Sequence, residues 1–297
     1  ADGAICKLAD GLPLDHPSQE TVPVPLDHPE FDDRLRARLK RHVVERCIYG
    51  VDIDPLAVEL ARMALWVETM DRRLPFGFLD HKLRCGNSLV GCWFDRFQDY
   101  PVMAFERDDA GDKSHDRFVH HFREYTAQRG KKKGEVQRSG DVWTQRWKQV
   151  REDVIKPEAR RWIEARGPQR QFSFATEGLT AEGIHDEALA VFRELHELPV
   201  HEADRREELY QQKIVDNPAL ARLREAFDTW CAIWFWPGDH LDLVPTPKNF
   251  QDPPEATRAI VRCLRDEHLF FHWEIEFPDV FTGPGSGFDA VIGNPPW

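Results

Sequence analysis

The sequence has few of the features that define several common classes of protein. Its six cysteines are scattered over 297 residues and form no C-x-x-C pair, which argues against a disulfide framework or a zinc cluster. It has no apolar run long enough to span a membrane and no signal-peptide pattern at its start, so we expect a cytoplasmic protein. The formal net charge of −12 argues against a general nucleic-acid coat but is compatible with one basic groove.

A metal site is also poorly supported. His268 and His272, in HLFFH, form the one histidine pair with helical spacing. A two-histidine site needs a further ligand, and the sequence offers no evident one. We therefore interpret the pair as structural and expect no metal.

The first 95 residues combine an irregular segment with half of a parallel α/β sheet. Residues 1–46 hold a proline-rich stretch, with PLDHP twice, and then a basic amphipathic helix with a solvated arginine-rich face. Residues 47–95 predict a short strand at Cys47–Val51, a helix that begins at Asp54-Pro55, and a second strand within HKLRCGNSLVG. The predicted apolar stripes of the two helices are Phe31, Leu35, Leu39 and Val43, and Leu56, Leu60, Ala64 and Val67.

A long helical stretch separates the second predicted strand from the next one along the sequence. Residues 96–272 show helical periodicity at 141–166, 181–197, 202–236 and 255–271, which predicts a mostly helical insertion with an aromatic-rich core. The run at 131–133 predicts an exposed loop. Residues 273–297 predict a buried strand around Phe288, Ala290, Val291 and Ile292, and then a stiff loop at Asn294, Pro295, Pro296 and Trp297.

Polar residues follow each of the three predicted strands. Asp52 ends the first strand, where a carboxylate can accept hydrogen bonds from both ribose hydroxyls of a nucleoside. Ile53 offers an apolar face to the attached base, and the Asn87 side-chain carbonyl can accept a hydrogen bond from an adenine amino group. The pattern indicates a nucleoside-containing cofactor.

The last loop suits an amino group as the second ligand. Its two prolines leave the Asn294 side chain and the Pro295 carbonyl as acceptors without competing backbone donors, while Pro296 stiffens the loop. Trp297 supplies a flat face for an unstacked base, a contact of about 1–3 kcal/mol. A sulfonium methyl group beside such an amino group would give methyl transfer to nitrogen.

The motifs resemble those of a known enzyme family. NPPW after FDAVIG is similar to the catalytic motif of amino-methylating, S-adenosylmethionine-dependent DNA methyltransferases. IYGVDIDPLAVELARMALW, CGNSLVG, FDTWCAIWFWP and FHWEIEFPDVF resemble the large bacterial adenine-N6 methylases of restriction-modification and phage-defence systems. The likeness covers about residues 46–93 and 226–297.

This resemblance implies a Rossmann-like class I methyltransferase sheet and the cofactor S-adenosyl-L-methionine. Asp52 would bind the ribose, Ile53 would pack on the cofactor adenine, and Asn87 would contact its amino group, although the family more often has Asp there. Asn294 and Pro295 would hold the N6 amino group of a target adenine flipped out of double-stranded DNA, and Trp297 would stack on that base. The resemblance also implies a nuclease or other defence-system subunits as partners. It implies no membrane association.

The family's glycine-rich first motif is missing from residues 1–46, so we expect an interior piece of a longer enzyme that is inactive alone. Three other readings stay open. A dehydrogenase-like nucleotide binder would need the same missing loop, and a helical interaction module would leave the strand-end residues unexplained. The same four residues could also methylate glutamine in a protein, or the amino group of cytosine.

Overall fold

The structure is a computed structural model of the chain, and it divides into two units that are described one at a time. It describes residues 3–4, 21–22, 27, 29–69, 79–97, 99–105, 149–166, 180–198, 202–282 and 285–293. Unit 1 consists of residues 1–86, 186–217 and 277–297, and unit 2 of residues 87–185 and 218–276. The described part is mostly helical, with one small parallel sheet. The predicted boundaries at 47, 96 and 273 stay predictions.

Unit 1 contains the predicted strand–helix–strand element. Helix α1 (Phe31–Cys47) leads to β3 (Gly50–Asp52), then α2 (Pro55–Glu68) and β4 (Leu83–Cys85). Strands β3 and β4 are parallel, with Gly50 opposite Leu83 and Asp52 opposite Cys85. A Cβ atom at Gly50 would lie 2.8 Å from Leu83 Cδ2, so the two strands come together where one side chain is missing. The predicted strand–helix–strand order is confirmed, but the first strand begins at Gly50 and not at Cys47, which is the last residue of α1.

The start of α2 follows the sequence signal. The Asp54 carboxylate accepts a hydrogen bond from the Leu56 backbone N–H at 2.9 Å, and Pro55 occupies the first helical position. An N-cap oxygen satisfies one of the free amide groups of the first turn, and proline has no amide hydrogen to lose there. The predicted cap is confirmed.

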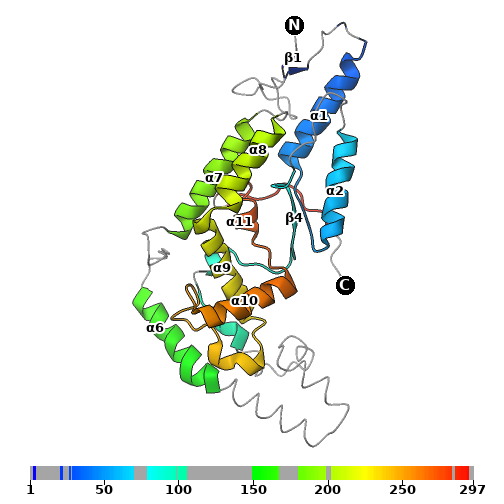
Figure 1. Cartoon of the computed structure of the whole chain (residues 1–297). Coiled ribbons are helices and arrows are strands. Elements are labelled where there is room, and N and C mark those ends of the chain that lie inside the picture. The colour runs from blue at the N-terminus through cyan, green and yellow to red at the C-terminus, as the bar shows by residue number, and fades with distance from the viewer. Residues whose placement is uncertain are drawn as a thin grey trace, which may run out of the picture. The chain divides into compact units, whose positions relative to one another are not determined.

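The two helices bury different faces from those that their stripes predict. Figure 1 shows α1 and α2 side by side, and an ion pair between Lys40 and Glu68 joins them. Their shared core contains Val44, Val58, Leu79 and Leu83, with Ile48, Ala61 and Leu65 packed around it. The predicted stripes are largely exposed instead, at Leu39, Val43, Leu56, Leu60 and Val67.

The buried face of α1 carries paired charges. Arg41 belongs to the arginine-rich face that is predicted to be solvated, but it is 5% exposed, and Glu45 is 1% exposed. Arg41 Nε lies 3.0 Å from Glu45 Oε1, and Glu45 Oε2 pairs with Arg206, which is fully buried. Burying the charged side of the helix requires this partner from α8, because a lone buried charge is strongly unfavourable. The predicted solvated position of Arg41 is wrong.

The remainder of unit 1 is helical. It holds the end of α7 (Ala181–Glu197), α8 (Ala203–Tyr210) and a π-helical turn, η3 (Gln211–Val215). In Figure 1, α7 and α8 lie next to each other, and the rings of Phe192 and Tyr210 meet edge to face with centroids 6.1 Å apart. Strands β1 (Gly3–Ala4) and β2 (Thr21–Val22) form a separate antiparallel pair.

Unit 2 has the predicted aromatic core. Its longer helices are α6 (Lys156–Arg166), α9 (Pro218–Ile233) and α10 (Glu255–His268). Short elements complete it: α3 (Phe94–Phe97), η1 (Val102–Phe105), η2 (Arg151–Ile155), η4 (Gly238–Leu243) and α11 (Trp273–Glu276). The residues Phe97, Phe105, Phe227, Trp236 and Phe250 are at most 1% exposed. Helices occupy most of the predicted stretches 181–197, 202–236 and 255–271, and of 141–166 the described residues 149–166 are helical.

The strand predicted at Phe288 is absent. Residues 285–293 form no strand, and Val291 and Ile292 are 76% and 98% exposed. A buried strand needs a neighbour for its backbone groups, and among the described residues β3 pairs only with β4. The prediction of a buried strand is wrong for this structure. The lysine run at 131–133 and the loop at 294–297 lie outside the described residues.

Candidate functional site

Asp52 and Ile53 stand at the carboxyl end of β3, as predicted. Asp52 Oδ1 accepts a hydrogen bond from the Asp54 backbone N–H at 2.8 Å, and the Asp52 backbone carbonyl accepts one from Gly86 at 2.9 Å. The first interaction holds the carboxylate in the turn between β3 and α2, and the second joins the Asp52 backbone to the chain after β4. The Asp52 side chain stays exposed, and Ile53 is 53% exposed. One oriented oxygen and an adjacent apolar side chain are therefore accessible to a ligand.

Asn87 follows β4 and is the first residue of unit 2. Its side-chain Oδ1 accepts the Leu89 backbone N–H at 3.1 Å, which closes a turn of its own. Its backbone N–H donates to the Leu269 carbonyl at 2.6 Å, beside a parallel bridge to Phe270. One lone pair of Oδ1 is committed to the turn, so a second is left for a ligand amino group.

The chain turns sharply after Asn87. A Cβ atom at Gly91 would lie 1.9 Å from the Phe271 carbonyl oxygen, closer than any real contact. The Phe271 backbone N–H donates to the Val90 carbonyl at 2.8 Å. The loop that carries Asn87 therefore rests directly on the backbone at Phe271, and only glycine permits this approach.

Residues Asn294, Pro295, Pro296 and Trp297 lie outside the described residues, so their predicted roles stay predictions. The segment before them is described to Gly293, and Ala290 to Gly293 are exposed. Its nearest packed residue is Phe288, whose ring centroid lies 5.3 Å from that of Tyr49 and 5.7 Å from that of Phe281.

A buried polar cluster in unit 1 is absent from the sequence prediction. It contains Tyr49, Lys82, His196 and Asp279. Lys82 Nζ lies 3.2 Å from Asp279 Oδ2 and 3.2 Å from His196 Nε2, and it also hydrogen-bonds to the Tyr49 hydroxyl. Burial and the positive charge of Lys82 lower the pKa of His196 to about 3, so its ring is neutral. Burial, and next the negative charge of Asp279, raise the pKa of Tyr49 well above its ordinary value.

Only a weak signal in the sequence pointed to this cluster. Lys82 directly precedes the predicted second strand, where a charged side chain must either reach solvent or find a buried partner. The partners lie far along the chain, with Asp279 197 residues after Lys82. Single-sequence periodicity carries no information about such pairs.

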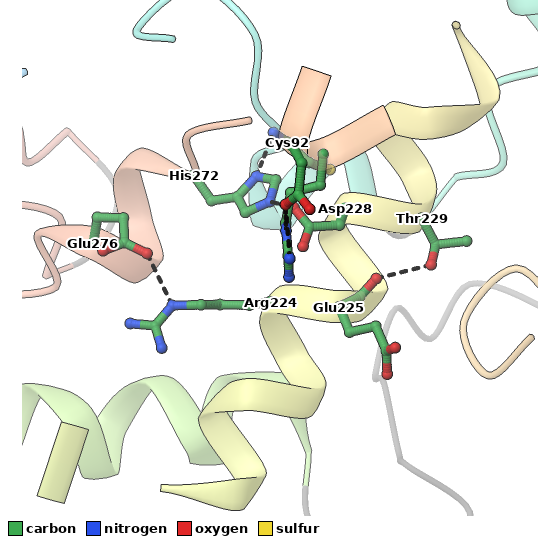
Figure 2. A network of polar contacts seen from close by, with 9 residues as sticks. Cys92, Arg224, Glu225, Asp228, Thr229, His272 and Glu276 are labelled. Carbon is green, nitrogen blue, oxygen red and sulfur yellow. Dashed lines mark hydrogen bonds and ion pairs between the residues drawn. The ribbon is translucent and has the colours of Figure 1, made fainter. Parts of the chain in front are cut away.

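Unit 2 contains a Cys–His–Asp group, shown in Figure 2. His272 Nε2 lies 3.0 Å from Asp228 Oδ1, and His272 Nδ1 accepts the Cys92 backbone N–H at 3.1 Å. Because Nδ1 accepts this hydrogen bond, it carries no hydrogen of its own. Nε2 therefore carries the ring N–H and donates a hydrogen bond to Asp228.

This group is not arranged for nucleophilic catalysis. The Cys92 thiol donates to the Trp93 carbonyl at 3.5 Å, and burial raises its pKa well above the ordinary value. A nucleophilic cysteine needs a lowered pKa and a base at its sulfur. His272 instead fastens the loop at Cys92 to helix α9, which agrees with the structural reading of the histidine pair.

A second interaction in Figure 2 reaches the same helix. Arg224 Nε donates to Glu276 Oε1 at 2.8 Å, and so ties α9 to α11.

The described residues contain no group of three or more potential metal ligands. None of the helices in the described ranges combines the length and the apolar character needed to cross a membrane.

Comparison with known proteins gives one family and one relative. The model of the Eco57I restriction-modification methylase family matches residues 46–297. A Methanocaldococcus jannaschii protein, named as a putative type II restriction enzyme and methyltransferase, is 40% identical over 65 residues. That match covers 19% of this chain and 5% of the relative, and no solved structure matches the chain. Since the family match covers most of the sequence, the chain belongs to the Eco57I restriction-modification methylase family.

Proposed function

We propose that this chain carries the catalytic part of an S-adenosylmethionine-dependent methyltransferase that acts on the N6 amino group of adenine in double-stranded DNA. The observation that carries the proposal is Asp52, an exposed carboxylate held at the end of a strand within a matched methylase family. We further propose that β3, α2 and β4 belong to a Rossmann-like class I methyltransferase sheet. Its ligands bind where parallel strands end.

The strand-end residues fit the nucleoside half of the cofactor. Asp52 keeps one carboxylate oxygen in its turn and has the other for ribose hydroxyls. Ile53 is exposed next to it and can cover one face of the cofactor adenine. Asn87 can accept a hydrogen bond from the adenine amino group through its second lone pair. When bound, the cofactor supplies an electrophilic methyl group on a positively charged sulfur.

The proline loop fits the target amino group. The Asn294 side chain and the Pro295 carbonyl would each accept one N–H of the adenine amino group, with Pro296 keeping the loop stiff. Acceptors on both hydrogens would leave the nitrogen lone pair directed away from them. As the nitrogen formed its bond to the methyl carbon, the bond from that carbon to sulfur would break with its electron pair left on sulfur, and the nitrogen would lose one proton to solvent. Trp297 would stack on the base, which must leave the duplex before N6 becomes accessible.

The identity of the modified atom tests the proposal. The full-length gene product is incubated with unmethylated double-stranded DNA and methyl-labelled S-adenosylmethionine, and the products are digested and separated by mass spectrometry. We expect the label in N6-methyladenine. Label in N4-methylcytosine, or in protein glutamine when a protein substrate is supplied, would replace the proposed substrate. Because the M. jannaschii relative is named as a restriction enzyme too, DNA cleavage is followed in the same samples.

Asn294→Ala is the decisive variant. Loss of one acceptor that acts at the transition state typically lowers a rate by about 10²–10³-fold. We expect methyl transfer to fall by this factor, while cofactor affinity in titration calorimetry stays unchanged. Near-normal methylation by the variant would remove Asn294 from its catalytic role.

A further inference from the structure

The buried cluster lies at the amino ends of the strands that carry the proposed cofactor residues. Tyr49 directly precedes β3, Lys82 directly precedes β4, and the Gly50 backbone N–H donates to the Lys82 carbonyl at 2.9 Å. Asp52 closes the other end of β3. The three-residue strand β3 therefore connects the cluster to the proposed ribose-binding carboxylate.

Lys82 is fully satisfied where it lies. Its side chain is 1% exposed, and an ammonium group has three N–H donors. Three acceptors surround it: the Tyr49 hydroxyl, His196 Nε2 and Asp279 Oδ2. Its ammonium nitrogen also lies 3.7 Å from the centroid of the Tyr49 ring. A buried lysine held by this many partners fixes the position of each partner as well.

Asp279 brings the carboxyl-terminal segment into this cluster. Its Oδ2 accepts hydrogen bonds from both Lys82 and the Tyr49 hydroxyl, and it lies 3.4 Å from His196 Nε2. On either side of Asp279 the segment packs on the same tyrosine ring. Phe277 and Phe288 meet the Tyr49 ring edge to face, with centroids 5.0 Å and 5.3 Å away.

The described chain beyond Phe288 is exposed at every position up to Gly293. Asn294 follows Phe288 by six residues. The nearest described point at which the segment is packed is therefore the contact with Tyr49. The Tyr49 ring and the Asp279 carboxylate therefore link this segment to the residues that precede β3 and β4.

We infer that Asp279 is a positioning residue: with Tyr49 and Lys82 it anchors the chain at Phe277, Asp279 and Phe288 to the amino ends of β3 and β4, upstream of the proposed Asn294 loop. The inference rests on the proposed function for its catalytic consequence. The anchor itself is a property of unit 1 and is measured without turnover. A shift of about 1 Å in a reacting group can lower a rate by about 10²-fold, so loss of such an anchor is expected to lower the rate of methyl transfer.

The charge of Lys82 gives the anchor a pH dependence. Burial lowers the pKa of Lys82 to about 8 from 10.5, against the opposing effect of Asp279. The groups that face it are Tyr49, His81, His196 and Asp279, with Arg46 and Arg206 close enough to act on its charge. Above about pH 8 the ammonium loses its proton and the ion pair with Asp279 loses its charge.

Stability and positioning respond to this change in opposite directions. Because the pKa is lowered in the folded state, the charged form carries a cost that is fully present below about pH 8 and absent above 10.5. Through Lys82 alone, stability therefore rises between these values. The rate of methyl transfer falls over the same range if the ion pair positions the loop.

The first experiment compares Asp279→Asn with the matched control Asp204→Asn, an exposed aspartate on α8 of the same unit. Hydrogen–deuterium exchange in the full-length protein reports the anchor without turnover. We expect exchange in residues 277–293 to become at least 10-fold faster in Asp279→Asn and to stay unchanged in the control. Unchanged exchange in Asp279→Asn would overturn the anchor, whatever reaction the protein catalyses.

The second experiment measures kcat from pH 6 to 10. Asp279→Asn is expected to lower kcat about 10- to 100-fold with an unchanged Kd for S-adenosylmethionine. The wild-type protein is expected to lose rate near pH 8, and Lys82→Arg, which keeps its charge, to lose it at a higher pH. Absence of methylation by the wild-type protein would reject the proposed function and leave the exchange result to decide the anchor.

A double variant covers the case in which Lys82→Arg does not fold. Lys82→Met with Asp279→Leu removes both charges together, and such replacements of buried pairs are often neutral for stability. We expect near wild-type thermal unfolding, reduced kcat and no rate loss near pH 8. Wild-type kcat in this variant would reduce Asp279 to a structural residue and overturn the inference.

Discussion

The two oxygens of the Asp52 carboxylate have separate tasks. Oδ1 holds the turn into α2, and under the proposed function the exposed side chain would offer Oδ2 to the ribose hydroxyls. Hydrogen bonds to a charged group contribute about 1.5–3 kcal/mol, or about 10- to 100-fold in affinity. We expect Asp52→Ala to raise the Kd for S-adenosylmethionine by this factor in titration calorimetry, with DNA affinity largely intact.

Asp54→Ala is the matched control for Asp52→Ala. It removes a neighbouring carboxylate that caps α2 but leaves the backbone N–H that Asp52 accepts. Loss of an N-cap costs about 1 kcal/mol of unfolding free energy, with no reason for weaker cofactor binding. If Asp52→Ala and Asp54→Ala show the same Kd for S-adenosylmethionine, the role of Asp52 is to hold the turn and not to bind the ribose.

At the residue scale, local chemistry could be predicted and distant chemistry could not. The Asp54-Pro55 helix start is confirmed because a cap depends only on residues within one turn. The partners of Lys82 were missed because His196 and Asp279 lie 114 and 197 residues further along the chain. No periodicity links positions that far apart.

Among the elements, helices were predicted better than the faces they bury. The bounds predicted for α7 match those of the structure, and β3 and β4 pair in parallel as predicted. The apolar stripes of α1 and α2 gave the wrong faces, and on α1 the buried side includes Glu45, whose charge is paired with Arg206 of α8. Strand formation near Phe288 could not be judged locally, since a strand requires a partner.

The buried charges between α1 and α8 make a direct prediction for stability. Arg206→Met removes one of the two arginines that pair with Glu45, which is 1% exposed, and leaves Arg41 beside it. Removing one member of a buried charge network costs about 3–5 kcal/mol. We expect a loss of this size in urea denaturation followed by circular dichroism.

The matched variant replaces the whole network. Arg41→Met, Glu45→Leu and Arg206→Met together leave no lone charge in the core, so most of the lost stability should return. A triple variant no more stable than Arg206→Met alone would show that Arg206 stabilises the fold by packing and not by its charge.

For the whole molecule, contact between distant segments matters more than sequence order. Unit 1 is assembled from three stretches, 1–86, 186–217 and 277–297, although 186–217 falls inside the predicted insertion. Helical periodicity identifies such a segment but says nothing of the unit it joins. Glu45, Lys82 and Tyr49 all have partners in the two later stretches.

This assembly predicts that the first stretch does not fold alone. A chain ending at Gly86 would keep β3, α2 and β4 but would bury Lys82 and Glu45 without Asp279 and Arg206. We expect it to show no cooperative thermal transition by circular dichroism, whereas residues 1–297 do. A sharp transition in the short chain would show that the strand–helix–strand element is self-sufficient.

The contact at Gly91 has a consequence for how freely the sequence can vary. With the Phe271 carbonyl where the Cβ atom would be, even alanine cannot enter without moving the backbone. Two positions earlier, Leu89 is 69% exposed and meets no such limit. In a saturation library selected for folded, protease-resistant protein, position 91 should keep glycine alone while position 89 accepts most side chains. Enrichment of any larger residue at position 91 would contradict the close approach, and a depleted position 89 would show that exposure is a poor guide to tolerance in this loop.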